Sequence, residues 1–317
     1  IAWADTIKKF RNEQGIHTKV MTISEIGGND IQNINSFFED VYNTWDPVPA
    51  GVLLMADFGT EDDGITSISF TDPYEGSYIT DNFYADLTGN TLPDFVFARL
   101  VGRDNEELEL MVHKFINYER NPPTQESFYN EPITALGWQT ERWFQICSET
   151  VGGYMLNVLG KNPNRINAIY EGNPDVDPWS TANNPTTVMN YFGPNGLNYL
   201  PATPGELGEW TGGTPQDIIS AINSGAFILQ HRDHGFYSGW GEPAFQSNHI
   251  NQLTNVDLLT HVFSINCQTG QFDVGDNSFG EKFLRHQNGG ALSITAPSQV
   301  SYSFVNDALV WGIYDNM

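Results

Sequence analysis

Basic residues are scarce in this sequence, with 14 Lys and Arg against 39 Asp and Glu over 317 residues. The formal net charge of −25 repels phosphate backbones, so we expect no nucleic-acid partner. The shortage of Lys, together with abundant Asn, Gly, Tyr and Trp, is typical of a secreted bacterial protein. The composition therefore predicts an extracellular or cell-surface location.

Long apolar runs are also missing from the sequence. None approaches the roughly 20 residues that a helix needs to cross a bilayer, so we expect no membrane span. The chain begins at Ile1 without a signal-like segment, which predicts a processed or trimmed N-terminus. The apolar stretch Ala308–Tyr314 near Met317 predicts that a longer polypeptide continues beyond it.

The remaining composition indicates a folded chain of about two domains. Hydrophobic residues make up 39% of the sequence and aromatic residues 13%, which argues against disorder. Paired prolines among polar residues in Asn117–Ser127 mark the clearest boundary. We therefore predict an N-terminal unit over residues 1–125 and a second unit over residues 126–317, with the junction near Gln125.

Helix and strand patterns alternate along both predicted units. Helical spacing of apolar residues and capping residues predict helices over Ile31–Tyr42, Asp104–Phe115, Glu149–Leu159, Thr214–Gly225 and Phe279–Gln287. Short apolar runs predict strands over Gly51–Ala56, Pro132–Trp138, Ala226–Gln230, His261–Asn266 and Ala291–Ala296. The stretch Asn162–Gly213 is predicted mostly as loop. Strands separated by helices pair in parallel, so the expected class is α/β with parallel-rich sheets flanked by helices.

His234 and Cys267 follow two consecutive predicted strands, where ligands bind in open parallel sheets. An imidazole beside a thiol stabilises the thiolate and lowers the cysteine pKa from about 8.5 by several units. The thiolate can attack an acyl carbon, after which the histidine protonates the leaving amine. The backbone N–H groups of Gly235 and Cys267 are candidates for an oxyanion hole, in which one donor is worth about 3 kcal/mol of barrier.

Three other interpretations of these residues stay open on the sequence alone. Cys147 and Cys267 are the two cysteines of the chain, and a secreted protein can join such a pair in a disulfide. Cys267 can also be a buried structural cysteine beside a hydrogen-bonded histidine. Finally, His231, His234 and Cys267 together have the ligand types of a zinc site.

Several short motifs resemble those of the gingipain-type cysteine peptidases. The motifs are DHGFYSGWG (Asp233–Gly241), HINQLTN (His249–Asn255), INCQTGQFD (Ile265–Asp273) and SFGEKFL (Ser278–Leu284), with weaker similarity at DFVFAR (Asp94–Arg99). They occur in the family's order and at nearly its spacing. The resemblance implies a caspase-like α/β fold in two subdomains.

The resemblance also implies catalytic residues. His234 corresponds to the general acid/base and Cys267 to the nucleophile. The family's histidine-orienting acid falls on Gln139, and Glu141 is the nearest carboxylate. Either Glu141 takes that role or the Gln139 amide holds the imidazole, and the alternative for Glu141 is a solvated loop carboxylate.

Substrate-binding residues are implied in the same way at three positions. The tryptophan after the HG pair is Trp240. The acid that selects basic side chains in the lysine-specific relatives maps to Asn306, with Asp307 beside it. An amide at this place weakens selection for Lys, whereas Asp307 restores it if the loop shifts by one residue.

A calcium site is a further expectation, for a glycine-containing loop rich in oxygen ligands. The segment Tyr84–Asp94 has acidic and amide side chains around Gly89, and the alternative is an Asx-rich turn. The spacing and the resemblance together give the expected ligands as Asp57, Asp86, Asn90, Asp94 and the carbonyl oxygen of Leu92. Thr88 stands where the family has another acid, which weakens the expected site.

These features predict a secreted cysteine endopeptidase that hydrolyses peptide bonds in protein or peptide substrates through a thioester acyl-enzyme. The chemistry needs no cofactor, and calcium would be structural. One alternative is a sortase-like transpeptidase of the same fold, in which an amine replaces water. The other is a catalytically silent, calcium-stabilised surface or binding protein that kept the fold.

Overall fold

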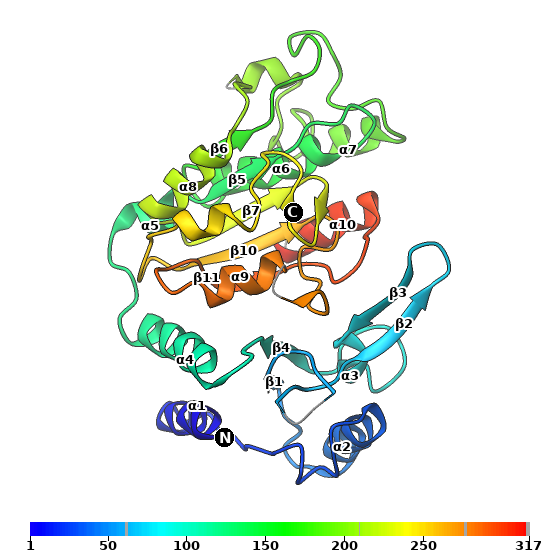
Figure 1. Ribbon diagram of the computed structural model, residues 1–317. Coiled ribbons are helices and arrows are strands. Elements are labelled where there is room, and N and C mark those ends of the chain that lie inside the picture. Colours follow the sequence, from blue (N-terminus) through cyan, green and yellow to red (C-terminus); the bar gives the residue numbers. More distant parts are fainter. Residues whose placement is uncertain (61–62, 209, 276–277, 315–317) are drawn as a thin grey trace. The chain divides into compact units, whose positions relative to one another are not determined.

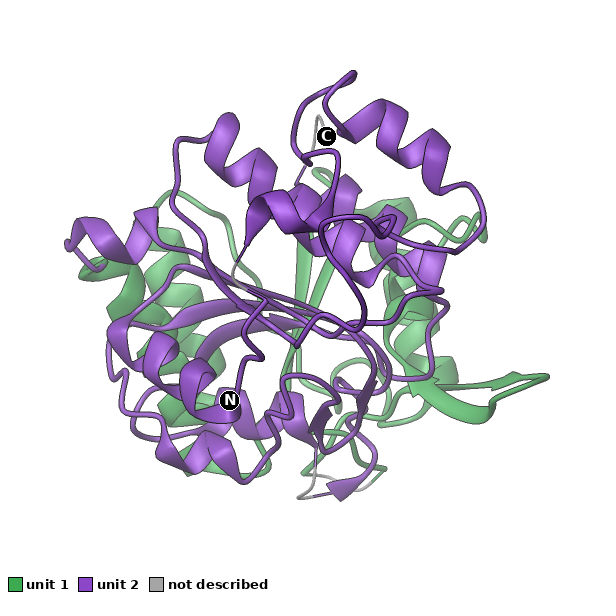
Figure 2. Cartoon of the chain, turned by 90° about the horizontal axis from the view of Figure 1, so that it is seen from above, with its two compact units in different colours: residues 1–122 green, residues 123–317 purple. Residues whose placement is uncertain are grey.

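The computed structural model describes residues 1–60, 63–208, 210–275 and 278–314 (Figure 1). The chain divides into two compact units, Ile1–Pro122 and Pro123–Met317, coloured separately in Figure 2. This division lies beside the junction expected near Gln125. No helix in the described part of the chain is long and apolar enough to cross a membrane.

Unit 1 is built on two small sheets and their helices. Its elements are α1 (Ala2–Glu13), α2 (Ile31–Thr44), β1 (Gly51–Met55), β2 (Ile68–Asp72), β3 (Gly76–Thr80), α3 (Asn82–Ala85), β4 (Val96–Leu100) and α4 (Asn105–Arg120). Strands β1 and β4 pair in parallel, with Gly51 opposite Val96, whereas β2 and β3 form an antiparallel hairpin. One core cluster joins α2 to β1, and a second joins α1 to α4.

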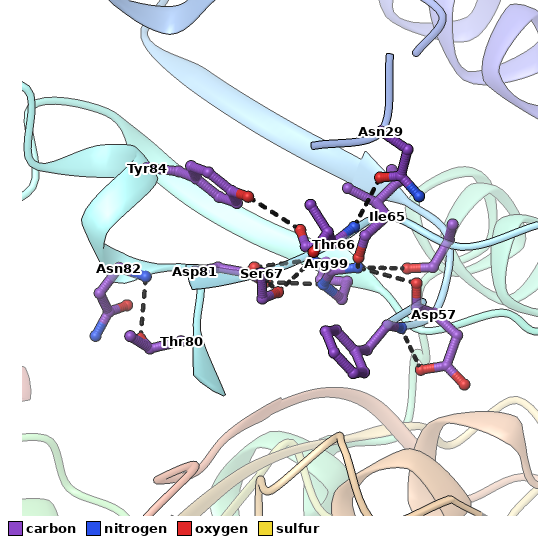
Figure 3. A network of polar contacts seen from close by, with 12 residues as sticks. Asn29, Asp57, Ile65, Thr66, Ser67, Thr80, Asp81, Asn82, Tyr84 and Arg99 are labelled. Carbon is purple, nitrogen blue, oxygen red and sulfur yellow. Dashed lines mark hydrogen bonds and ion pairs between the residues drawn. The ribbon is translucent and has the colours of Figure 1, made fainter. Parts of the chain in front are cut away.

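Arg99 of β4 is the hub of a polar network in unit 1 (Figure 3). Its Nε and Nη2 atoms donate to the two carboxylate oxygens of Asp81, each at 2.8 Å. Nη2 also donates to Ser67 Oγ, and Nη1 donates to the carbonyl oxygens of Ala56, Asp57 and Ile65. One nearly buried guanidinium therefore joins β4, the end of β1, the following loop and the start of α3.

Unit 2 contains a five-stranded parallel sheet in the order β11-β10-β7-β5-β6. Its strands are β5 (Ile133–Leu136), β6 (Asn164–Asn167), β7 (Ile228–Arg232), β10 (Thr260–Ile265) and β11 (Ala291–Thr295), and β8 (Gly235–Phe236) and β9 (Gly239–Trp240) form a separate hairpin. Its α-helices are α5 (Glu126–Asn130), α6 (Phe144–Asn157), α7 (Pro185–Phe192), α8 (Pro215–Ser224), α9 (Phe279–Arg285) and α10 (Ser303–Ile313), with short 3₁₀ helices at Pro204–Leu207 and His249–Gln252.

Helices cover both faces of this parallel sheet (Figure 2). On one face, buried residues of α8 and α9 pack with β5, β7 and β10 in the largest core cluster. On the other face, α6 and α10 supply Cys147, Val151 and Val310, which pack with Ile265 of β10. Apolar layers on both sides keep the strands in register, so the carboxyl ends of β7 and β10 are held rigidly.

Most of the expected elements are present, and their caps explain where several begin. The side chains of Asp30, Asp104, Thr214 and Ser278 accept backbone N–H groups at the starts of α2, α4, α8 and α9. The expected strands over Ala226–Gln230 and His261–Asn266 correspond to β7 and β10, each shifted by one or two residues.

One expected helix boundary was wrong, and some elements were not predicted. Helix α6 begins at Phe144 rather than Glu149 and continues through Gly152 and Gly153. A Cβ on Gly153 would lie 1.9 Å from the carbonyl oxygen of Tyr199, so this glycine permits close packing and does not end the helix. The stretch Asn162–Gly213 is mostly loop, as expected, and also contains the short elements β6 and α7, whereas α1 was not predicted.

Candidate active site

The carboxyl ends of two neighbouring strands bring His234 and Cys267 to the same edge of the sheet. Strands β7 and β10 pair in parallel up to Arg232 and Ile265. His234 lies two residues after the end of β7, and Cys267 lies two residues after the end of β10. A Cβ on Gly235 would lie 2.9 Å from the carbonyl oxygen of Cys267. The two backbone segments are therefore in van der Waals contact where the predicted dyad residues stand.

The His234 side chain is exposed, and its ring is held by an amide. Its Nε2 atom lies 2.6 Å from Gln139 Oε1, and Gln139 Nε2 donates to Glu141 Oε1 at 2.6 Å. Gln139 follows the end of β5, next to β7 in the sheet. The His234 and Phe144 rings are nearly perpendicular, with ring centroids 5.1 Å apart. The structure thus places both predicted orienting residues in series with the imidazole.

Nearby charged side chains shift the pKa of His234 in opposite directions. Burial of part of the ring lowers the pKa of His234, and the cationic side chains of Arg142 and Arg232 lower it further. Glu141 and Glu242 raise this pKa. The imidazole is therefore biased toward its neutral form in the resting protein, the form that can accept a proton.

Cys267 is a free, half-buried thiol. Its Sγ atom donates to the carbonyl oxygen of Ser301 at 3.6 Å. Ser301 Oγ in turn donates to the carbonyl oxygen of Asn266 and accepts from Asn306 Nδ2 at 2.7 Å. Ser301, in the loop before α10, thus forms hydrogen bonds with the Cys267 sulfur and with the residue that precedes it. Cys147 is also free and fully buried in α6, so the disulfide interpretation is wrong.

A buried polar network supports the residue before Cys267. Asn266 Nδ2 donates to His231 Nδ1 at 3.0 Å, and Asn266 Oδ1 accepts from Thr269 Oγ1 at 2.6 Å. His231 Nε2 lies 3.0 Å from the carbonyl oxygen of Glu242, to which it must donate because a carbonyl only accepts. Burial lowers the pKa of His231 to about 3, so the ring is neutral.

This network removes the zinc interpretation. Both ring nitrogens of His231 are engaged in hydrogen bonds, so neither offers a lone pair to a metal. Across the described ranges of the chain, no three His, Cys, Asp or Glu side chains gather where they could hold a metal ion.

The three predicted substrate-binding residues are corrected to structural ones. Trp240 is fully buried, stacks on His231 at 4.0 Å and donates to Ser264 Oγ. Asp307 is fully buried and accepts from Arg232 Nε at 2.6 Å, and Asn306 is nearly buried against Ser301. Side chains enclosed in this way cannot contact a substrate in this conformation.

Gly235 lies at the start of the short strand β8, opposite Trp240 of β9. A Cβ at this position would lie 2.7 Å from the side chain of Asn266, so the close approach of the two segments requires glycine. The oxyanion-hole function of its N–H group stays a prediction.

The loop expected to bind calcium is closed by its own hydrogen bonds. Asp86 accepts from the backbone N–H groups of Asn90 and Thr91, and Asp94 Oδ2 accepts from those of Leu87 and Thr88. The Asp57 carboxylate accepts from Phe58 N, and Asn90 Oδ1 accepts from Leu92 N. These residues are arranged as Asx turns and do not fit a preformed calcium cluster, so calcium binding stays a prediction.

Several contributors were missed at the sequence level. Arg232, Phe144 and Ser301 each contact a predicted site residue, but their residue types carry no catalytic signal. The Arg232 guanidinium lies 4.3 Å from the centroid of the Phe144 ring, which also packs perpendicular to the His234 ring. A charged residue at the end of a buried strand was the one signal available for Arg232.

Comparison with known proteins gives a consistent family. The model of peptidase family C25 matches residues 1–317. Gingipain R2 of Porphyromonas gingivalis is 24% identical over 289 residues, which cover 89% of this chain and 32% of that protein. Lys-gingipain of the same organism is 23% identical over 270 residues, covering 85% of this chain and 13% of that protein.

Solved structures show the same fold. The complex of the pro- and mature domains of Porphyromonas gingivalis RgpB matches with a TM-score of 0.73 and 19% identity, covering 96% of this chain and 64% of that chain. The Arg specific cysteine proteinase gingipain R matches with a TM-score of 0.71 and 20% identity, covering 95% and 60%. The chain therefore spans about a third of gingipain R2 and less than two thirds of these solved chains.

Proposed function

The chain belongs to peptidase family C25, and from this premise we propose that it is a cysteine endopeptidase with Cys267 as nucleophile and His234 as general acid/base. The observation that carries the proposal is the contact between the His234–Gly235 and Asn266–Cys267 segments at the carboxyl edge of the sheet. A free thiol and an exposed imidazole on adjacent chain segments have the composition that a thiolate–imidazolium pair requires.

The proposed reaction has two halves. Cys267 transfers its proton to His234, and the thiolate sulfur forms a bond to the carbonyl carbon of the scissile peptide. The tetrahedral intermediate then collapses, the C–N bond breaks, and His234 gives its proton to the leaving amine, which leaves a thioester on Cys267. His234 next takes a proton from water, whose oxygen forms a bond to the thioester carbon. The C–S bond then breaks, the acid product leaves, and His234 returns the proton to the sulfur.

The oxyanion that forms in each half needs hydrogen-bond donors. We propose that the backbone N–H groups of Gly235 and Cys267 supply them, and the absence of a side chain on Gly235 supports close approach of a substrate carbonyl. A pair of such donors acts in the transition state, in which the oxygen carries the charge.

Substrate selection is proposed to differ from that of the relatives named for Lys or Arg. Asp307, the acid next to the mapped pocket position, pairs with Arg232 in the interior, and Asn306 binds Ser301. The Asp307 carboxylate is enclosed with Arg232, and Asn306 carries an amide in place of a carboxylate. We therefore expect neither residue to select a Lys side chain in the substrate. Secretion is proposed from the composition alone.

A peptide library tests the proposed function. We expect the protein to cleave internal peptide bonds and Cys267→Ala to reduce kcat/KM by about 10³-fold or more. His234→Ala should reduce it by about 10²-fold or more. The matched control is Cys147→Ala, which removes the other thiol and should keep activity.

The same library separates the alternatives. Products joined to an added amine, in place of free acids, would indicate the transpeptidase. Absence of any turnover in folded protein, or full activity of Cys267→Ala, would contradict the proposed function and favour the silent binding protein.

A further inference from the structure

We infer that Gln139 and Glu141 act in series as positioning residues, with Glu141 fixing the Gln139 amide so that it selects the Nε2–H tautomer of His234. The inference rests on the proposed function, because it assigns which ring nitrogen serves Cys267. Both members lie after β5 and are two residues apart, so one short loop presents the pair to the imidazole.

The chemistry of the three side chains determines which group donates and which accepts in each of the two hydrogen bonds. An ionised carboxylate only accepts, so the group of Gln139 that lies 2.6 Å from Glu141 Oε1 must be its NH₂. The hydrogen bond from Gln139 lowers the pKa of Glu141, which keeps this carboxylate ionised at neutral pH. The amide oxygen of Gln139 then faces His234 Nε2 at 2.6 Å and can only accept.

The neutral imidazole must therefore carry its proton on Nε2. Its lone pair is left on Nδ1, the one ring nitrogen available to take the proton of the Cys267 thiol and to return it to the leaving amine. The proton on Nε2 stays in place throughout the reaction. A Gln139 amide turned by 180° would donate to Nε2 and move the ring proton to Nδ1, where it blocks this transfer.

Without Glu141, nothing in this pair chooses between the two amide orientations. Glu141 is exposed, so water weakens the effect of its charge on the ring, and its main contribution is orientation. The other charged groups that act on His234 are Arg142, Arg232 and Glu242, and each remains when Glu141 is replaced.

The test uses ¹⁵N NMR of the His234 ring in the Cys267→Ala protein, so that neither turnover nor the thiol affects the readout. Neutral His234 should be the Nε2–H tautomer. Glu141→Ala should produce a mixture of tautomers, whereas Glu141→Gln, whose side-chain oxygen can still accept from Gln139, should keep the Nε2–H form. Glu171→Ala, which removes an exposed carboxylate elsewhere in unit 2, is the matched control and should change nothing.

A second variant tests the order of the two residues. Gln139→Glu places an acceptor on His234 Nε2 that cannot donate, so adding Glu141→Ala to it should leave the Nε2–H tautomer intact. In the active protein, Glu141→Ala should lower kcat/KM about tenfold, which is a part of the 10²- to 10⁴-fold that acid–base catalysis supplies, and Glu141→Gln should restore most of it.

The outcomes separate this inference from the proposed function. An Nδ1–H tautomer in the parent protein, an unchanged tautomer in Glu141→Ala, or equal losses in Glu141→Ala and Glu141→Gln would overturn the inference. If Glu141→Ala produces the expected mixture of tautomers but neither the parent nor any variant shows turnover, the positioning inference stands and the peptidase proposal is refuted.

Discussion

Asp233 lies between the buried Arg232 and the exposed His234, and its carboxyl group is almost fully enclosed. Its Oδ2 atom accepts from Glu242 N at 2.7 Å, and a Cβ on Gly137 would lie 2.1 Å from its Cγ. Burial raises the pKa of Asp233 to about 7, although the two backbone N–H groups of His234 and Glu242 lower it. The protonated form is therefore favoured in the folded protein below neutral pH.

This pKa predicts a pH-dependent loss of stability. In the unfolded chain Asp233 releases its proton near pH 4, whereas the folded chain holds it to about pH 7. Between these values the folded state binds more protons, so Asp233 makes the free energy of unfolding fall as pH rises through this window. Asp233→Asn removes this contribution, and its oxygen can still accept from Glu242 N.

Thermal unfolding at two pH values measures the effect. We expect Asp233→Asn to raise Tm relative to the parent at about pH 8 and to leave it nearly unchanged at about pH 4, since each pKa unit corresponds to about 1.4 kcal/mol. An equal change of Tm at both pH values would show that the titration of Asp233 does not control stability.

Residue types at strand ends were enough to predict the dyad candidates, because the position after a parallel strand is a property of local sequence. The burial of Asp307 was not predictable in this way. Its partner Arg232 is 75 residues away in the chain, and only the packing of α10 against the sheet brings them together. The same holds for Trp240, whose place in the core depends on His231 and Ser264.

At the scale of elements, the Arg99 network determines how four segments of unit 1 meet (Figure 3). The Arg99 side chain is 5% exposed and that of Asp81 is 13% exposed, so removal of the cation leaves an almost buried carboxylate without its main partner. Arg99→Ala should lower the free energy of unfolding of unit 1 by about 3 to 5 kcal/mol.

Denaturant unfolding followed by a probe in unit 1 measures this loss. The control is Arg103→Ala, which breaks the ion pair with Glu107 on an arginine whose side chain is 45% exposed, and should cost about 1 kcal/mol or less. Equal losses of unfolding free energy in the two variants would show that the Arg99 network stabilises unit 1 no more than an exposed ion pair does.

The loop between α3 and β4 supports a separate prediction about calcium. Asp94 Oδ2 accepts two backbone N–H groups, so Asp94→Ala should destabilise this loop by about 1 to 3 kcal/mol without any metal. We expect the same loss of Tm in excess EDTA and in millimolar calcium. A loss confined to the calcium-containing sample would instead establish Asp94 as a ligand and support the calcium prediction.

Element prediction succeeded where caps and apolar spacing agreed, as at α2, α4 and α8. It placed the start of α6 five residues too late, because Trp143 makes no side-chain cap and the residues from Phe144 to Gly152 are all buried, so the first turns lack the apolar and polar spacing of an amphipathic helix. It also failed for α7, whose buried side chains pack on α6 and on the following loop. Such stabilisation is non-local and leaves little trace in the local sequence.

At the scale of the whole molecule, the net charge of −25 is the dominant electrostatic feature. Like charges repel one another more in the compact state than in the expanded chain, and salt screens this repulsion. Raising NaCl from about 20 mM to about 500 mM shortens the Debye length from about 20 Å to about 4 Å, so Tm should rise at neutral pH. Near the sequence pI of about 4.3 the rise should largely disappear.

The α/β class with parallel strands could be predicted for the whole chain, because alternating helices and strands leave few other arrangements. The sheet order could not, since it depends on which strands pair across long separations.

A Tm that does not change with salt at neutral pH would contradict the salt prediction and show that specific ion pairs, rather than net repulsion, govern stability.

The pH dependence of Cys267 alkylation tests the proposed dyad most directly. Mass spectrometry of the Cys267 peptide after brief exposure to iodoacetamide gives the rate at each pH, and Cys147, being buried, serves as the slow internal reference. If His234 activates the thiol, alkylation should remain fast well below the ordinary cysteine pKa of about 8.5, and His234→Ala should return the profile to that value. A profile centred near 8.5 in the parent protein and unchanged in His234→Ala would contradict the account.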